Sequence, residues 1–199
     1  YATTLLRDAG ISAQAFLASE YATTPPPVRE DTLVVGVTQS GETADTLGAL
    51  REAAGRNATT LAVTNVVGSS AARECDHALF IRAGPEIGVA ATKTFTSQLL
   101  AANLLVASLA DRDGDRALVE ALRALPGDVQ AVLDDSAAAA VAEEYLDSRA
   151  FFFVGRGLDY PVALEGALKF TEITYEHAEG FAAGELKHGP LALVGERTP

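Results

Sequence analysis

The sequence predicts an α/β protein with a parallel sheet that helices cover on both faces. Two observations lead to this prediction. Short apolar runs alternate along the chain with segments of helical periodicity, which is the pattern of strand–helix–strand units. The runs at residues 33–37 and 60–64 are also apolar throughout, as in strands that are buried on both faces of a parallel sheet.

The first α/β unit is predicted in residues 1–125. A helix is expected at residues 2–19, and the three prolines at 25–27 require a loop after it. The remaining elements follow from apolar runs and helical spacing. We expect strands at 33–37, 60–64 and 78–81, helices at 44–55 and 70–74, and a long buried helix or helix pair at 86–110.

The second unit is predicted in residues 126–199, after linking helices. Helices are expected at 117–125 and 129–133, because L-P-G-D at 125–128 should separate them, and a helix should end within 142–148. We then expect a strand at 149–157, a helix at 161–175 and the start of another strand at 191–194. A single strand and helix cannot form a sheet, so this second subdomain is expected to be incomplete.

Composition narrows the functional class. Of the 199 residues 48% are hydrophobic, which is typical of a globular protein, and the net charge of −12 argues against binding to nucleic acid or to an anionic membrane.

Cys75 is the single cysteine, so neither an intrachain disulfide nor a cysteine-based zinc site is expected. We see no signal peptide and no apolar run of membrane length, and we expect a cytoplasmic enzyme or binding protein without metal or cofactor. The start at Tyr1 and the end at Pro199 suggest a fragment of a longer protein.

A polar turn follows the first predicted strand. The segment T-Q-S-G-E-T (residues 38–43, called the hydroxyl turn below) leads into the helix at 44–55. Ligands bind parallel sheets beyond the carboxyl ends of the strands, and a helix N-terminus there suits a phosphate. The segment lacks the lysine of a Walker loop and the glycine spacing of a dinucleotide site, which favours a sugar monophosphate. Capping of the helix by Ser40 or Thr38 explains the same residues equally well.

A second group of chemically active side chains lies near the end of the chain. Glu165, Lys169 and Glu172 are spaced to share one helix face. A carboxylate held beside a lysine can act as a general base, although an exposed ion pair without chemical meaning is the commoner explanation of this spacing. His188 stands in the glycine-flanked segment F-A-A-G-E-L-K-H-G-P and can exchange protons near neutral pH.

Several long motifs together resemble one enzyme family. They are TQSGETADTL, NVVGSS, GPEIGVAATKTFTSQL, GRG and ALEGALKFTEITYEHAEGFAAGELKHGPLAL, in this order and over almost the whole chain. The sequence resembles the isomerase part of the glutamine–fructose-6-phosphate aminotransferases (isomerizing), or glucosamine-6-phosphate synthases. The resemblance implies two sugar isomerase (SIS) subdomains of the flavodoxin-like type, each a doubly wound three-layer α/β/α structure, with the second incomplete here.

The resemblance also implies roles for individual residues. It assigns the sugar phosphate to Thr38, Gln39, Ser40 and Thr43, and a backbone contact with the sugar to Val89. It further implies that Glu172 moves a proton between C1 and C2 of the open-chain intermediate, with Lys169 as its partner. Finally, it implies that His188 opens the sugar ring of a neighbouring subunit, so that the enzyme is a homodimer.

The implied reaction converts fructose 6-phosphate and ammonia to glucosamine 6-phosphate, in amino-sugar biosynthesis towards UDP-N-acetylglucosamine. A glutaminase domain upstream of Tyr1 would supply the ammonia, and a further lysine beyond Pro199 would complete the site. We therefore expect little or no activity from these residues alone. Two alternatives stay open: another SIS-type sugar-phosphate isomerase or deglycase, and a phosphosugar-sensing module without catalysis.

Overall fold

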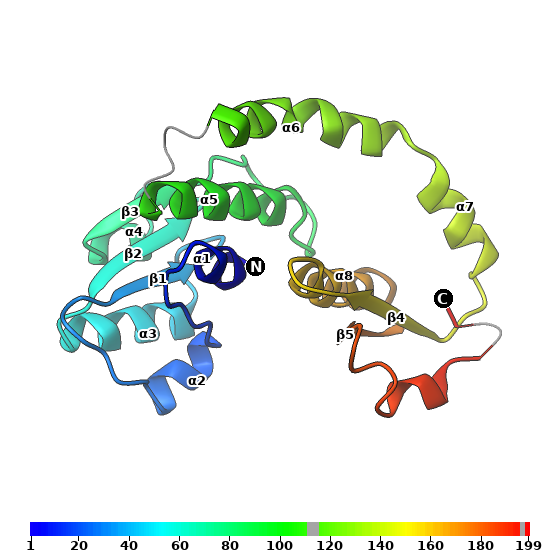
Figure 1. Cartoon of the computed structure of the whole chain (residues 1–199), viewed down its shortest axis with the longest axis horizontal. Helices are drawn as coiled ribbons and strands as arrows, with labels where there is room; N and C mark the ends of the chain where they lie inside the picture. The colour runs from blue at the N-terminus through cyan, green and yellow to red at the C-terminus, as the bar shows by residue number, and fades with distance from the viewer. Residues whose placement is uncertain (111–115, 196–197) are drawn as a thin grey trace. The chain divides into compact units, whose positions relative to one another are not determined.

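The computed structural model describes residues 1–110, 116–195 and 198–199, and the chain forms two compact units (Figure 1). The N-terminal unit consists of Ile11–Leu105 with Ala2, and the C-terminal unit consists of Val106–Pro199 with Tyr1 and Thr3–Gly10. Each unit contains its own parallel sheet. The predicted subdomain ranges stay a prediction, and residues 111–115 and 196–197 within them lie outside the described part of the chain.

The sheet of the N-terminal unit has three parallel strands in the order β1-β2-β3. The central strand pairs through Leu33↔Thr59 on one side and Leu61↔His77 on the other. Because all strands are parallel, their carboxyl ends meet at one edge of the sheet. The elements of this unit are α2 (Ala18–Thr23), β1 (Leu33–Val37), α3 (Ala44–Gly55), β2 (Thr59–Thr64), α4 (Ser70–Glu74), β3 (His77–Phe80) and α5 (Lys93–Leu109) as far as Leu105.

Helices cover both faces of this sheet, as the sequence predicts. On one face, Leu50 of α3 packs in a buried cluster with Ala62 of β2 and Ala71 of α4. On the other face, Leu61 of β2 packs with Ala101 of α5. Neighbouring residues of a strand point to opposite faces, so the continuous apolar run of β2 supplies both clusters. Full burial of one such leucine contributes roughly 1.5–3 kcal/mol.

The C-terminal unit contains a strand–helix–strand unit. Strand β4 (Ala150–Gly155) runs into α8 (Asp159–Thr174), and β5 (His177–Ala182) returns parallel to β4 with Ala150 opposite His177. The ring of Phe170 on α8 packs on Phe151 and Phe153 of β4, with centroid distances of 4.2 and 5.8 Å. The other elements of this unit are α1 (Ala2–Asp8), α6 (Arg116–Asp134), α7 (Ala137–Glu144) and the 3-10 helix η1 (Pro190–Leu193).

Glycines allow the close approach of helix and strand in this second sheet. A Cβ atom on Gly180 of β5 would lie 2.7 Å from the Cα of Leu164 on α8, and one on Gly166 would lie 3.0 Å from the ring of Phe153. Both distances are shorter than an ordinary van der Waals contact, and at Gly180 the contact is with backbone, so glycine is needed there. The helix that carries Lys169 and Glu172 is thereby fixed against β4 and β5.

Some of the predicted elements are wrong. The helix expected at residues 2–19 ends already at Asp8, because Gly10 has a φ of +79° that ends helical geometry, and the next helix, α2, begins only at Ala18. The helix expected from residue 86 starts only at Lys93, since the Glu86 carboxylate binds the N–H groups of Thr92 and Thr94 and so closes residues 86–92 as a loop before α5. The expectation that L-P-G-D would separate two helices is also wrong, because α6 continues through Pro126.

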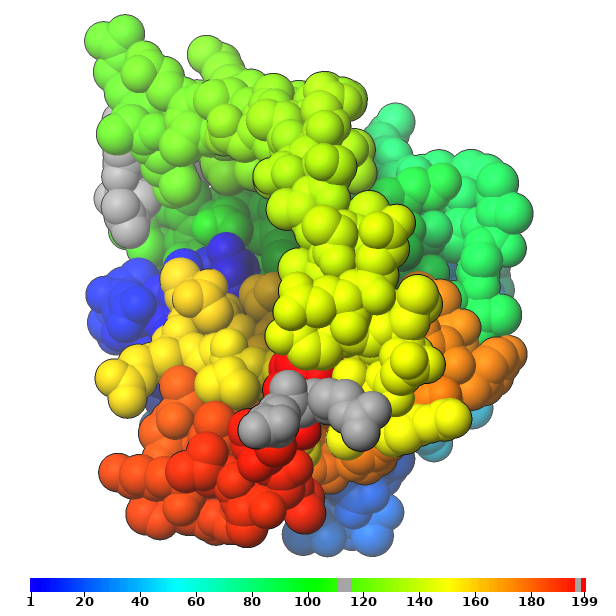
Figure 2. Space-filling model, turned by 90° about the vertical axis from the view of Figure 1, so that its right-hand side faces the viewer, coloured from blue at the N-terminus to red at the C-terminus, as the bar shows by residue number. Residues whose placement is uncertain are grey.

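At the C-terminal end, residues 191–194 do not begin a strand. Pro190 starts η1 after Gly189, whose φ of +134° favours glycine, and the segment (red) lies at the surface in Figure 2. The strand β5, by contrast, was not predicted: its sequence H-A-E-G-F-A has too few branched residues to indicate a strand. Within residues 1–110 and 116–195, we find no helix both long and apolar enough to cross a membrane.

Candidate functional site

The hydroxyl turn lies at the carboxyl end of β1, where ligands bind parallel sheets. Its hydroxyls organise the turn itself. The buried Thr38 accepts a hydrogen bond at Oγ1 from the N–H of Gly41 (3.2 Å), and its Oγ1 lies 3.2 Å from that of Thr43. Ser40 Oγ accepts from the N–H of Glu42 at 3.1 Å. Each hydroxyl both donates and accepts, so Ser40 and Thr43 retain capacity for a ligand.

The alternative that Ser40 or Thr38 caps α3 is wrong. The residue at the N-cap position is Thr43, and its side chain makes no capping hydrogen bond. The partners of Ser40 and Thr38 are Glu42 and Gly41, which precede the helix. The first N–H groups of α3 therefore have no side-chain cap among the described residues, and such groups attract an anion.

The turn is locked onto the start of α4. The carbonyl of Gly41 accepts from the N–H of Ala71 at 3.0 Å, and Glu42 Oε1 accepts from the N–H of Ser70 at 2.8 Å. The second bond holds the pKa of Glu42 below its ordinary value, because it stabilises the carboxylate. Gly41 has a φ of +72°, and an added Cβ would overlap the side chain of Ser69. These contacts hold the turn in a fixed position against α4.

Val89, predicted to contact the sugar through its backbone, lies in the loop at residues 82–92 of the same unit. Val89 is 95% exposed. Within the loop, Glu86 Oε1 accepts from the N–H groups of Thr92 and Thr94 and from the Thr94 hydroxyl, at 3.0, 2.9 and 2.8 Å. The bonds from Thr94 hold the pKa of Glu86 below its ordinary value. This carboxylate anchors the loop to the first turn of α5.

The second predicted group lies on α8 in the C-terminal unit. Lys169 Nζ lies 2.6 Å from Glu172 Oε2 and 3.6 Å from Glu165 Oε1. The three side chains are 20%, 31% and 26% exposed, so they form a half-buried triad rather than a solvated surface pair. Burial lowers the pKa of Lys169, but its hydrogen bond to Glu172 and the charge of Glu165 raise that pKa above its ordinary value. Lys169 is therefore a cation that lies in hydrogen-bond contact with the Glu172 carboxylate, the group that could act as a base.

His188 lies in the turns that follow β5, in the same unit as the triad. Its N–H donates to the carbonyl of Glu185 at 2.9 Å, and its side chain is exposed. Within the described residues, no hydrogen bond or ion pair joins it to Lys169 or Glu172. Its predicted role in a neighbouring subunit stays a prediction.

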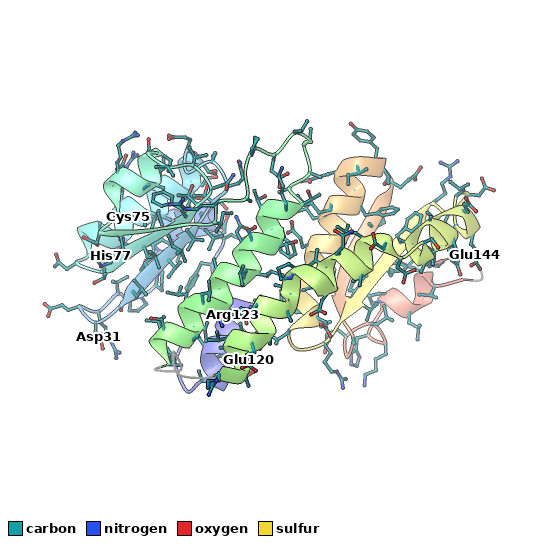
Figure 3. The ribbon with its side chains drawn as sticks, turned by 90° about the horizontal axis from the view of Figure 1, so that it is seen from above. Asp31, Cys75, His77, Glu120, Arg123 and Glu144 are labelled. Carbon is teal, nitrogen blue, oxygen red and sulfur yellow. The ribbon has the colours of Figure 1, made fainter. Side chains whose placement is uncertain are left out.

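The opposite end of the three-stranded sheet carries Cys75 and His77 at the start of β3 (Figure 3). Cys75 is a half-buried free thiol whose pKa is raised by burial. It borders a small cavity of about 80 Å³ beside the exposed ion pair of Arg51 and Glu74. In residues 1–110, 116–195 and 198–199, we find no cluster of three His, Cys, Asp or Glu side chains that could hold a metal ion.

The profile of the SIS domain family matches residues 2–108 and 144–199. The chain belongs to this family. It is similar to the glutamine–fructose-6-phosphate aminotransferase (isomerizing) of Halobacterium salinarum, with 58% identity over 100% of this chain and 34% of that protein. It is also similar to the enzyme of the same name from Methanosarcina acetivorans, with 53% identity over 96% of this chain and 32% of that protein. The chain thus spans about a third of the length of these curated relatives.

A solved structure shows the same fold. The C-terminal domain of glucosamine-fructose-6-phosphate aminotransferase from Francisella tularensis superposes with a TM-score of 0.91, at 39% identity, over 100% of this chain and 58% of that domain. The predicted doubly wound SIS-type fold and the predicted family resemblance are confirmed.

Sequence reasoning did not single out two residues that hold the hydroxyl turn. Thr64 ends β2 and Asn65 follows it, and the carbonyl of Gln39 accepts from Thr64 Oγ1 (3.3 Å) and from the N–H of Asn65 (3.0 Å). Polar residues at the end of an apolar strand, next to a predicted ligand turn, are the signal that could have found them.

Proposed function

We propose that this chain is the isomerase part of a glutamine–fructose-6-phosphate aminotransferase, a cytoplasmic enzyme that converts fructose 6-phosphate and ammonia to glucosamine 6-phosphate. The observation that carries the proposal is the half-buried ion pair of Lys169 and Glu172, with a 2.6 Å separation. A protein that only senses a phosphosugar needs an anion site but has no use for a paired base. Similarity to aminotransferases over the whole chain supports the same conclusion.

The hydroxyl turn would hold the phosphate. Thr38, Gln39, Ser40 and Thr43 lie in one turn, beside uncapped N–H groups of α3 that carry partial positive charge. Hydroxyls and main chain bind a monophosphate without Mg²⁺, which fits a sugar phosphate. The backbone at Val89 would contact the sugar, as the family resemblance implies.

Glu172 would move the proton that converts a ketose to an aldose. Ammonia adds to C2 of the open-chain sugar and the oxygen of C2 leaves as water, so that C2 carries an imine. The Glu172 carboxylate then takes a proton from C1 and returns it to C2, while the proton of the C1 hydroxyl passes to the imine nitrogen, which leaves the amine on C2 and the carbonyl on C1. The Lys169 ammonium stabilises negative charge during this transfer.

The remaining roles concern the assembled enzyme. We propose that His188 opens the sugar ring in the active site of a neighbouring subunit, so that a homodimer is the active form. A glutaminase domain of the full-length protein would supply the ammonia. Both proposals rest on the resemblance to the aminotransferases.

The test is the substitution Glu172→Gln in the full-length protein. The amide keeps the size of the side chain but cannot accept the proton, so kcat for glucosamine 6-phosphate formation should fall about a hundredfold to ten-thousandfold. Binding of fructose 6-phosphate, measured by calorimetry, should persist. Unchanged turnover would refute the role of Glu172.

The matched control is Glu144→Gln on α7, an exposed glutamate that is labelled in Figure 3. This variant should behave as the unmodified protein. Product analysis separates the alternatives: a deglycase would release ammonia from glucosamine 6-phosphate without forming it, and a simple isomerase would interconvert sugar phosphates without ammonia. A sensor would bind fructose 6-phosphate with no turnover in any variant.

A further inference from the structure

The side chain of Asn65 continues the pairing of β2 and β3 beyond their ends. The strands pair as far as Thr64, whose carbonyl accepts from the N–H of Ile81 at 3.1 Å. One residue later, Asn65 Oδ1 accepts from the N–H of Ala83 at 2.8 Å and Asn65 Nδ2 donates to the carbonyl of Gly84 at 2.7 Å. A side-chain amide carries the same donor and acceptor as a peptide group, so the Asn65 side chain takes the place of one more backbone pair between the two strands.

The backbone of the same residue holds the hydroxyl turn. The N–H of Asn65 donates to the carbonyl of Gln39 at 3.0 Å. Asn65 therefore touches two segments that are separate in the sequence: the turn proposed to bind phosphate through its backbone, and the start of the loop at residues 82–92 through its side chain.

The C-terminal part of the loop is also held in place by hydrogen bonds. Glu86 fixes it to the N–H groups of Thr92 and Thr94, and Thr94 is only 1% exposed. Between Glu86 and Thr92 the chain is open to solvent, since Ile87 and Val89 are both 95% exposed. Two anchors that flank an exposed segment are the arrangement expected for a backbone that is held ready for a ligand.

We propose that Asn65 is a positioning residue that sets the spacing between the phosphate-binding turn and the sugar-contacting loop. This inference rests on the proposed function, because it takes the hydroxyl turn as the phosphate site and Val89 as a sugar contact. Asn65 itself touches neither group of the substrate. It acts through Gln39 on one side and through Ala83 and Gly84 on the other.

The two contacts of Asn65 can be separated by substitution. In Asn65→Asp the carboxylate still accepts from Ala83 but repels the carbonyl of Gly84, so the loop loses its anchor. The bond to Gln39 comes from the backbone and survives in the variant. Sugar binding should therefore weaken while phosphate binding stays intact.

The experiment compares Asn65→Asp and Asn65→Ala with the unmodified full-length enzyme. KM for fructose 6-phosphate should rise about tenfold, the effect of one lost anchor, whereas the inhibition constant of inorganic phosphate should stay within about twofold. Hydrogen exchange of residues 82–92 should become faster in both variants. Asn57→Asp is the matched control, because Asn57 is exposed and precedes the opposite end of β2; it should change none of these values.

The outcomes separate the inference from the function on which it rests. If the unmodified enzyme neither binds nor converts fructose 6-phosphate, the proposed function fails. If it does, and Asn65→Asp has an unchanged KM or unchanged hydrogen exchange in the loop, the positioning role alone fails. An equal rise of KM and of the phosphate inhibition constant would also overturn it, because Asn65 would then support the turn and not the spacing.

Discussion

Replacement of Gly41 by alanine tests whether the hydroxyl turn needs its observed backbone geometry. Gly41 has a φ of +72°, and an L-residue pays roughly 1–2 kcal/mol in this left-handed region. The added Cβ would also overlap the side chain of Ser69 and lie 3.0 Å from Thr64 Oγ1. Displacement of Ser69 would break its capping bond to the N–H of Ala72, at a cost of about 1 kcal/mol.

These contributions sum to about 2–3 kcal/mol, and a less flexible unfolded chain returns about 0.5 kcal/mol. We expect Gly41→Ala to lower the free energy of unfolding by about 2 kcal/mol. For a protein of this size, that corresponds to a fall of about 4–8 °C in the thermal midpoint. The assay is thermal unfolding followed by circular dichroism, together with KM for fructose 6-phosphate, which should rise because the turn is displaced.

Two further variants make the test specific. Gly41→Ala with Ser69→Gly removes the steric overlap but keeps the backbone strain, and it also removes the capping hydroxyl of Ser69. Glycine at an N-cap costs only a few tenths of a kcal/mol relative to serine, so the double variant should recover about 0.5 kcal/mol. Gly48→Ala is the control, because Gly48 lies inside α3 with no atom within 4 Å of an added Cβ; it should stabilise the protein by about 0.5–1 kcal/mol. A Gly41→Ala protein as stable as the unmodified one would refute the reasoning.

Three other predictions concern stability. The backbone N–H and the hydroxyl of Thr60 hold the pKa of Asp76 below its ordinary value. Asp76 therefore contributes stability above about pH 4, and this stability is lost as the pH falls through the lower pKa of the folded state. Asp76→Asn should flatten the acid side of the curve of urea midpoint against pH, and an unchanged acid side would contradict this prediction. Gly180→Ala should destabilise the protein by about 1–3 kcal/mol in urea unfolding, because the added Cβ would meet the backbone of Leu164. Gly184→Ala should have little effect, since the atom nearest to the added Cβ there is 3.9 Å away. Pro126→Ala should increase helicity in far-UV circular dichroism and stabilise α6 by up to about 3 kcal/mol, because alanine restores the missing N–H inside the helix. Equal helicity would show that Pro126 does not strain α6.

Elements with a strong local signal were predictable from the sequence. The strand at residues 33–37 and the helices at 44–55 and 70–74 lie where the apolar spacing places them. The signal fails where backbone conformation decides the structure. Gly10 ends α1 early because it adopts a positive φ, whereas Pro126 does not end α6, and neither outcome is encoded in hydrophobic periodicity.

The candidate site divides in the same way. The sequence by itself determined the kinds of side chain present: a run of hydroxyls after a buried strand, and Glu165, Lys169 and Glu172 on one helix face. It left capping and phosphate binding equally probable for the hydroxyls, and a surface ion pair the commoner explanation of the triad.

Only the tertiary structure decided between some of these alternatives. It shows that Ser40 and Thr38 shape the turn and do not cap α3, because the parallel sheet brings α4 and the end of β2 against that turn. It also shows that Lys169 and Glu172 are half-buried, since α8 packs closely on the glycines and aromatic rings of β4 and β5. Long-range contacts such as those of Asn65 with Gln39 and Gly84 have no local signal, because they depend on the register of neighbouring strands.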